Sequence, residues 1–225
     1  MFQFFFSLSA LLLAALPLAF AGQAHAAGAA HSVRSLSETG FSGKSATADI
    51  TKTAQWVAAT LDNQRLPFVI VDKKNAQIFV FDAKGEVKGT SKVLLGLTAG
   101  DHGLADLAGR AVSSLSPAER TTPAGRFTAE PGRNLQGEDI IWLDYAAQLA
   151  IHRLRPDNQQ ERRAQRLATA SALDNRISYG CVIVPVAFYK SVIGPVLGNS
   201  RSVVYVLPET RPLQSMLNAL QSGAH

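Results

Sequence analysis

The chain has one cysteine among its 225 residues, Cys181, so it cannot form an internal disulfide. It also lacks runs of basic residues interleaved with aromatic residues, the pattern with which proteins bind single-stranded nucleic acid. Its formal net charge of +5 and its pI near 9.6 therefore indicate an anionic environment such as a cell envelope, and we expect no nucleic-acid partner.

Charged residues are also missing from the N-terminus. Residues 1–26 contain no Lys, Arg, Asp or Glu, and residues 4–20 are mostly Phe, Leu and Ala. This apolar stretch is short for a membrane span and is interrupted by Pro17, and the small-x-small pattern that ends at Ala26 is typical of a signal-peptidase site. A second such pattern ends at Ala21, and an uncleaved membrane anchor is the less favoured alternative. We predict a signal peptide over 1–26 and an exported protein without stable membrane insertion after cleavage.

Export changes the interpretation of Cys181. Structural cysteines in oxidising compartments come in pairs, so an unpaired one is either an intermolecular bridge or a reactive thiol. Cys181 follows Gly180 in a turn, and backbone amides beside a nucleophile on such a turn can face a developing oxyanion. The alternative is a buried cysteine that serves as a small hydrophobic residue.

The rest of the chain predicts one mainly β domain with few helices, either a sandwich or barrel-like. Its expected parts are a flexible arm with an N-terminal helix (27–65, the helix at 50–61), a central domain (66–208) and a C-terminal helix or tail (209–225). Strands are expected at 67–72, 77–82, 87–95, 139–143, 148–152, 177–184 and 202–207, the first three as an antiparallel meander. Further helices are expected within 158–170, after Pro185 and after Pro212.

Two histidines compete as a base for Cys181. His152 ends the predicted strand 148–152, whereas His102 lies in a glycine-rich loop and suits a substrate-side role. A Cys–His pair needs the imidazole near the sulfur and a third group that fixes the ring tautomer. A lone strand histidine is more often structural, but the unpaired exported cysteine favours a catalytic pair.

Four segments in this order resemble the L,D-transpeptidase (YkuD-like) catalytic domain, over about residues 67–207. They are the opening hairpin at 71–81, the turn Thr122-Pro123-Ala124-Gly125-Arg126-Phe127, the strand histidine in Ile151-His152, and the turn Ser178-Tyr179-Gly180-Cys181-Val182. The resemblance implies a β domain that cross-links peptidoglycan stem peptides in the periplasm or cell envelope, without metal or cofactor. We expect a monomer.

The resemblance also implies roles for individual residues. Cys181 would attack the L,D peptide bond of a donor tetrapeptide stem, releasing D-alanine, and an amine of a second stem would resolve the acyl-enzyme. His152 would be the general base, and amides of Tyr179, Gly180 and Cys181 would form the oxyanion hole. Ser178 would contribute to substrate binding.

The sequence departs from the family pattern at three points. Tyr179 replaces a second histidine, Ile183 replaces a polar Asn or Arg, and the separation of 29 positions from His152 to Cys181 exceeds the common spacing. The additional residues predict a helical lid with six arginines against three acidic residues: Arg153, Arg155, Arg162, Arg163, Arg166 and Arg176 against Asp157, Glu161 and Asp174. Guanidinium groups bind carboxylates, so we expect this lid, and Arg153 and Arg176 first, to recognise the donor stem.

Two other functions fit the same residues. One is an L,D-carboxypeptidase or hydrolase of the same fold, with water as acceptor. The other is a non-catalytic peptidoglycan-binding domain, suggested by Ile183.

Overall fold

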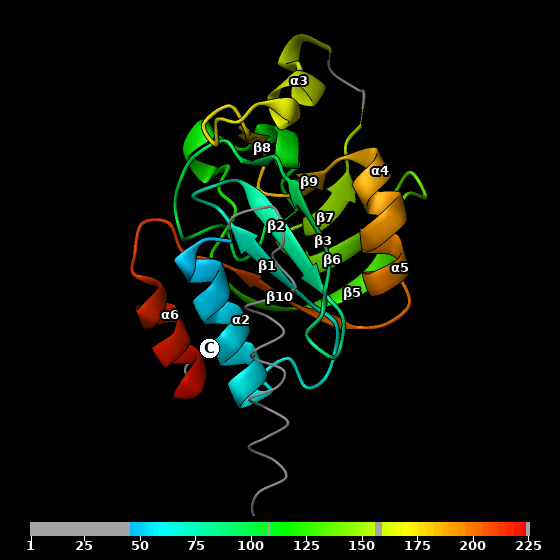
Figure 1. The fold of residues 1–225 in the computed structure, drawn as a ribbon. Helices are drawn as coiled ribbons and strands as arrows, with labels where there is room; N and C mark the ends of the chain where they lie inside the picture. The colour runs from blue at the N-terminus through cyan, green and yellow to red at the C-terminus, as the bar shows by residue number, and fades with distance from the viewer. Residues whose placement is uncertain (1–45, 108, 156–158, 224–225) are drawn as a thin grey trace, which may run out of the picture.

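The structure, a computed structural model, describes residues 46–107, 109–155 and 159–223 (Figure 1). The predicted signal peptide, most of the predicted arm and the residues 156–158 at the predicted start of the lid helix lie outside these ranges. Within them, no helix is both long and apolar enough to cross a membrane.

Eight strands form one mixed sheet in the order β3-β2-β1-β10-β5-β6-β7-β9, and β4 and β8 pair separately. The strands are β1 (Phe68–Asp72), β2 (Gln77–Phe81), β3 (Val87–Lys92), β4 (Leu95–Gly96), β5 (Gly125–Arg133), β6 (Asp139–Asp144), β7 (Leu149–Arg153), β8 (Arg176–Ser178), β9 (Val182–Val184) and β10 (Ser202–Val206). Neighbouring strands are antiparallel except β1 with β10 and β7 with β9 in the large sheet, and β4 with β8. The predicted mainly β class is confirmed, as is the antiparallel meander β1-β2-β3.

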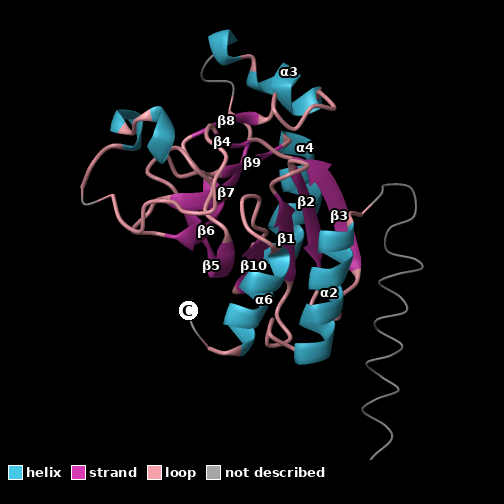
Figure 2. Ribbon diagram, turned by 90° about the vertical axis from the view of Figure 1, so that its left-hand side faces the viewer, coloured by secondary structure: helices cyan, strands magenta, loops and turns pink. Residues whose placement is uncertain are grey.

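Both faces of the central strands are covered, which explains why every residue of β1 is buried. Val69 and Val71 point into the inner core, which the curved sheet shares with residues from β6, β7 and β9. Phe68 and Ile70 point to the other face, because side chains alternate along a strand. There they pack beneath the helices α2 (Ala48–Thr60) and α6 (Leu213–Gln221), which lie side by side in Figures 1 and 2.

The predicted helices at 50–61, after Pro185 and after Pro212 are present. The hydroxyl of Thr47 accepts a hydrogen bond from Ile50 N at 3.4 Å at the start of α2, which satisfies one of the free amides of the first turn. After Pro185 the chain forms α4 (Val186–Phe188), a π-helical turn η4 (Tyr189–Ile193) and α5 (Gly194–Leu197), and these pack on the inner core.

Four expectations differ from the structure. The expected strand at 87–95 is two strands, β3 and β4, which belong to different sheets. The sequence analysis missed β5, the longest strand, because Pro131 and Gly132 within it are typical strand breakers. Pro131 lies beyond the pairing of β5 with β10, which ends at Ala129, so only β6 pairs with the chain at this position.

The expected strand at 177–184 is two strands, β8 and β9, separated by the turn that contains Cys181. The expected helix within 158–170 is also divided. A 3-10 turn, η3 (Gln159–Glu161), precedes α3 (Arg163–Ala168), and Arg162 between them adopts the left-handed conformation with φ of 50°. The helix α3 stands beside β8, away from α2 and α6 (Figures 1 and 2).

Candidate active site

His152 and Cys181 come from neighbouring parallel strands. In the register of β7 and β9, His152 lies opposite Ile183, and Cys181 directly precedes β9. Val182 and Val184 point into the inner core, so the alternation of side chains places Cys181 and Ile183 on the opposite face. Ile151 also points into the inner core, which puts His152 on the same face as Cys181. Both residues line one cavity of about 520 Å³.

The ring of His152 is fixed by the backbone. Its Nδ1 lies 2.9 Å from the carbonyl oxygen of Arg153. A carbonyl oxygen can only accept a hydrogen bond, so Nδ1 carries the proton and donates it. Nε2 is then the nitrogen with a free lone pair. Burial lowers the pKa of His152 to about 4, and the positive charges of Arg155 and Arg163 act in the same direction. The imidazole is therefore neutral at pH 7 and able to accept a proton.

The turn that carries Cys181 is held by side-chain hydrogen bonds. Ser178 Oγ donates to the carbonyl oxygen of Cys181 at 2.7 Å and accepts from Gly180 N at 3.1 Å. Thr122, which is fully buried, donates its hydroxyl to the carbonyl oxygen of Gly180 at 2.7 Å and accepts from Gly96 N at 2.9 Å. Gly180 has a φ of 137°, and an added Cβ would lie 3.0 Å from the carbonyl oxygen of Thr121. Glycine is therefore required at this position by both conformation and space.

These bonds refine the predicted roles of the turn residues. The amide of Gly180 is already bonded to Ser178, so the amides of Tyr179 and Cys181 remain as candidates for an oxyanion hole. Ser178 lines the cavity, but its hydroxyl closes the turn rather than facing a ligand as a free group.

The thiol of Cys181 is neutral at rest. Burial raises its pKa, whereas a backbone hydrogen bond and the charges of Arg155 and Arg163 oppose that rise. Sγ lies 3.4 Å from the carbonyl oxygen of Gln148, a contact typical of a protonated thiol that donates.

Two arginines of the predicted lid line the cavity, Arg155 and Arg163. The Nε of Arg155 donates to Glu138, and that of Arg163 donates to Glu161. A guanidinium has two further nitrogens that can donate, so each arginine can also bind a carboxylate in the cavity.

The two arginines that the sequence favoured lie elsewhere. Arg176 binds Glu209 through both terminal nitrogens and also donates to the carbonyl of Lys73 at 2.9 Å. Arg153 forms an ion pair with Glu138 at 2.8 Å. Within the described residues, neither arginine lines the cavity of Cys181, and neither does His102, which is exposed.

The position of Ile183 now has a physical explanation. Ile183 is buried in a small apolar cluster with Leu94 and with Leu167 of α3. It therefore anchors the additional segment on the sheet beside His152, where the family pattern places a polar residue.

A second wall of the cavity, formed by residues within 103–107 and 112–121, was not predicted from the sequence. The guanidinium of Arg120 lies 4.5 Å from the centre of the Tyr179 ring, a cation–π contact that joins this segment to the nucleophile turn. The signal in the sequence that could have indicated this wall was Tyr179, an aromatic residue at a position where the family often has histidine. The His, Cys, Asp and Glu side chains of the described ranges include no group of three that could hold a metal ion.

No family model and no curated protein matches the chain. One similar solved structure is the NMR structure of the catalytic domain of an L,D-transpeptidase from E. faecium, with 18% identity and a TM-score of 0.36, covering 63% of this chain and 96% of that one. Another is the crystal structure of residues 123–326 of the L,D-transpeptidase from Xylanimonas cellulosilytica, with 14% identity and a TM-score of 0.39, covering 63% and 60%.

Both solved structures come from the family that the sequence motifs resemble.

Proposed function

We propose that this protein is an exported L,D-transpeptidase that acts on peptidoglycan stem peptides through an acyl-enzyme on Cys181. The observation that carries the proposal is the pairing of the only cysteine, on a glycine turn, with a neutral histidine on the same face of the neighbouring strand. Both line a cavity whose volume of about 520 Å³ suits a peptide segment.

In the first half-reaction, Cys181 Sγ attacks the carbonyl carbon of the L,D peptide bond in the donor stem. His152 Nε2 takes the thiol proton as the S–C bond forms, and then gives it to the departing amine of D-alanine as the C–N bond breaks. The amides of Tyr179 and Cys181 hold the oxyanion of the tetrahedral intermediate. A thioester acyl-enzyme and free D-alanine result.

In the second half-reaction, a side-chain amine of another stem attacks the thioester carbonyl. His152 accepts the proton of that amine and returns it to the departing sulfur, so the enzyme regains its neutral thiol. The carbonyl of Arg153 keeps the same ring nitrogen available in both halves, because it fixes the proton on Nδ1.

Arg155 and Arg163 supply the recognition of the donor's carboxylates. Both guanidinium groups line the cavity wall, whereas the carboxylates that pair with them, those of Glu138 and Glu161, do not. The positive charge at the wall attracts an anionic stem peptide.

Acylation by a carbapenem, a thiol-reactive β-lactam, tests the chemistry. Intact-mass measurement should show one adduct on the wild-type protein and none on Cys181→Ser. An inert wild-type thiol would contradict the proposal and support the non-catalytic peptidoglycan-binding domain. Incubation with purified muropeptides then separates acceptors, because transpeptidation yields cross-linked dimers whereas a carboxypeptidase yields only shortened stems.

A further inference from the structure

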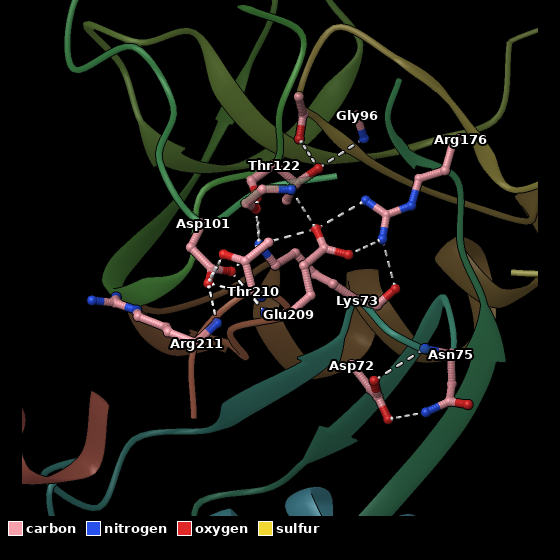
Figure 3. Close-up of polar contacts among 12 residues, drawn as sticks. Asp72, Lys73, Asn75, Gly96, Asp101, Thr122, Arg176, Glu209, Thr210 and Arg211 are labelled. Carbon is pink, nitrogen blue, oxygen red and sulfur yellow. Dashed lines mark hydrogen bonds and ion pairs between the residues drawn. The ribbon is translucent and has the colours of Figure 1, made fainter. Parts of the chain in front are cut away.

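A cluster of charged side chains joined by hydrogen bonds and ion pairs lies inside the protein (Figure 3). Its centre is Lys73, which directly follows β1 and is completely buried. The ammonium donates to the carbonyl of Gly100, to Asp101 Oδ1 at 3.0 Å and to the carbonyl of Thr122 at 2.9 Å. An ammonium has three protons, and these three acceptors satisfy all of them, which compensates for its removal from water.

Three further side chains complete the cluster: Asp101, Arg176 and Glu209. Glu209 Oε1 lies 3.4 Å from the ammonium of Lys73, and Glu209 also accepts from both terminal nitrogens of Arg176. The cluster thus contains two cations and two anions, and its charges balance. A buried network of this kind stabilises one arrangement of the chain because loss of any member leaves an uncompensated charge.

Asp101 extends the cluster to the segment after β10. It accepts from the backbone amides of Glu209 at 2.7 Å, Thr210 at 3.0 Å and Arg211 at 3.0 Å, and from the hydroxyl of Thr210 at 2.6 Å. Burial alone would raise the pKa of Asp101, but these hydrogen bonds and Lys73 outweigh it and hold that pKa well below its ordinary value. The carboxylate therefore stays charged.

Thr122 connects this cluster to Cys181. Its carbonyl accepts from Lys73, and its hydroxyl donates to the carbonyl of Gly180. Arg176 provides a second connection, since it begins β8, the strand that ends at Ser178. None of the four cluster residues lines the cavity of Cys181 as the described residues form it, so any effect on chemistry passes through Thr122 or β8.

We propose that Lys73, Asp101, Arg176 and Glu209 are positioning residues that hold the Cys181 turn in its reactive orientation, chiefly through Thr122. This inference rests on the proposed role of Cys181 as nucleophile. The competing explanation is that the cluster stabilises the fold alone.

Substitution of Thr122 separates these explanations. Thr122→Val keeps the shape of the side chain and removes its hydroxyl, whereas Thr122→Ser keeps the hydroxyl. Thr53→Val is the matched control, because Thr53 is equally buried and its hydroxyl donates to the carbonyl of Asp49 at 2.8 Å in α2, remote from the site. The measurements are the melting temperature, the second-order rate of carbapenem acylation and the pH midpoint of Cys181 alkylation by iodoacetamide.

We expect Thr122→Val to slow acylation about ten- to a hundredfold, because a displacement of about 1 Å at a reacting group has effects of this size. Thr122→Ser should restore most of the rate. Thr53→Val should lower the melting temperature and leave the acylation rate unchanged. If Thr122→Val lowers only the melting temperature and leaves both the acylation rate and the alkylation midpoint at wild-type values, the positioning role is refuted.

The cluster itself is tested with Lys73→Met, which keeps the length of the side chain and removes the charge. It should slow acylation about as much as Thr122→Val does. The variant with both substitutions should be acylated no more slowly than the slower single variant, because both substitutions act through the contact between Thr122 and the Cys181 turn. Should Lys73→Met fail to fold, Glu209→Gln replaces it, with a smaller loss in the same direction. Wild-type acylation in the folded cluster variant would overturn the proposal.

Alkylation keeps the two proposals distinguishable, because it requires a thiol but no transpeptidase chemistry. A wild-type protein that resists carbapenem contradicts the proposed function. The positioning inference is then decided by alkylation: a midpoint displaced in Thr122→Val and Lys73→Met but not in Thr53→Val supports it, and unchanged midpoints refute it.

Discussion

The buried imidazole of His152 makes the stability of the protein depend on pH in a defined range. In an unfolded chain a histidine has a pKa of about 6.5, whereas burial lowers the pKa of His152 to about 4 in the folded protein. Between these values the unfolded state binds a proton that the folded state excludes. Acidification through this range therefore favours unfolding, and the stability contributed by a neutral His152 is complete above pH 6.5 and lost as the pH falls to about 4.

The magnitude follows from the difference between the two pKa values. Each pKa unit corresponds to about 1.4 kcal/mol, so the free energy of unfolding should fall by about 3 kcal/mol from this group alone. Because a domain of this size is stabilised by about 5–15 kcal/mol in total, such a loss is readily measurable.

Urea unfolding of wild-type protein and His152→Gln between pH 3.5 and pH 7.5, a range set by the linkage relation, tests this. Other titratable groups contribute equally to both proteins, so the difference between the two stability curves isolates His152. As the pH falls from 7 to 4, the free energy of unfolding of the wild type should fall by about 3 kcal/mol more than that of His152→Gln. Parallel curves for wild type and His152→Gln would show that His152 is not a buried neutral base.

Three further outcomes follow from the site. Cys181→Ser should abolish transpeptidation with a change in melting temperature of a few degrees at most, which paired turnover and melting measurements would check; retained turnover would exclude Cys181 as nucleophile. The double substitution Arg155→Gln and Arg163→Gln should raise KM for a donor with free carboxylates more than KM for its amidated analogue. The control is Arg201→Gln, which should change neither KM, because Arg201 is exposed and paired with Glu130. Equal effects of the double substitution on both donors would refute a carboxylate-binding role. Gly180→Ala should both lower the melting temperature and slow carbapenem acylation, because the added Cβ meets backbone at 3.0 Å; a wild-type rate would show that this turn is not constrained as described.

Much of the sheet could be predicted because its pattern is local. The apolar runs of β1 and β2 and the turn between them specify a hairpin without reference to the rest of the chain. The presence of Cys181 and His152 at one cavity could also be expected, although from residue types and order along the chain rather than from any local pattern. The structure adds the reason: β7 and β9 are adjacent and parallel, so both side chains emerge on one face.

Lys73 shows what the sequence could not reveal. Its sequence context, Lys73-Lys74-Asn75-Ala76, is typical of a turn, in which a lysine is usually exposed, yet Lys73 is fully buried. Its partners Asp101 and Thr122 lie 28 and 49 residues further along the chain, so only the folded sheet brings them together. Burial of a charge depends on such distant partners and leaves no periodic signal.

The two arginines favoured from the sequence, Arg153 and Arg176, do not line the cavity, and the reason is again the three-dimensional arrangement of the chain. Arg153 was favoured because it follows His152, but successive residues of a strand point to opposite faces of the sheet. Adjacency in sequence therefore separates these two side chains in space. Arg155, just beyond the end of β7, and Arg163, at the start of α3, line the cavity instead.

The resting state of the pair follows from the same burial. Many reactive cysteines are stored as thiolates beside an imidazolium, which requires a low thiol pKa. Here burial raises the thiol pKa above its ordinary value and lowers the imidazole pKa to about 4, so transfer of the thiol proton to His152 is unfavourable. A stored thiolate is therefore disfavoured, and in the proposed reaction the proton moves as the S–C bond forms. Arg155 and Arg163 lower both pKa values, so they ease formation of the thiolate but oppose the imidazolium. A donor carboxylate bound between them would neutralise part of that positive charge and favour the protonated base, so binding of the correct donor would itself promote the proton transfer that starts the reaction.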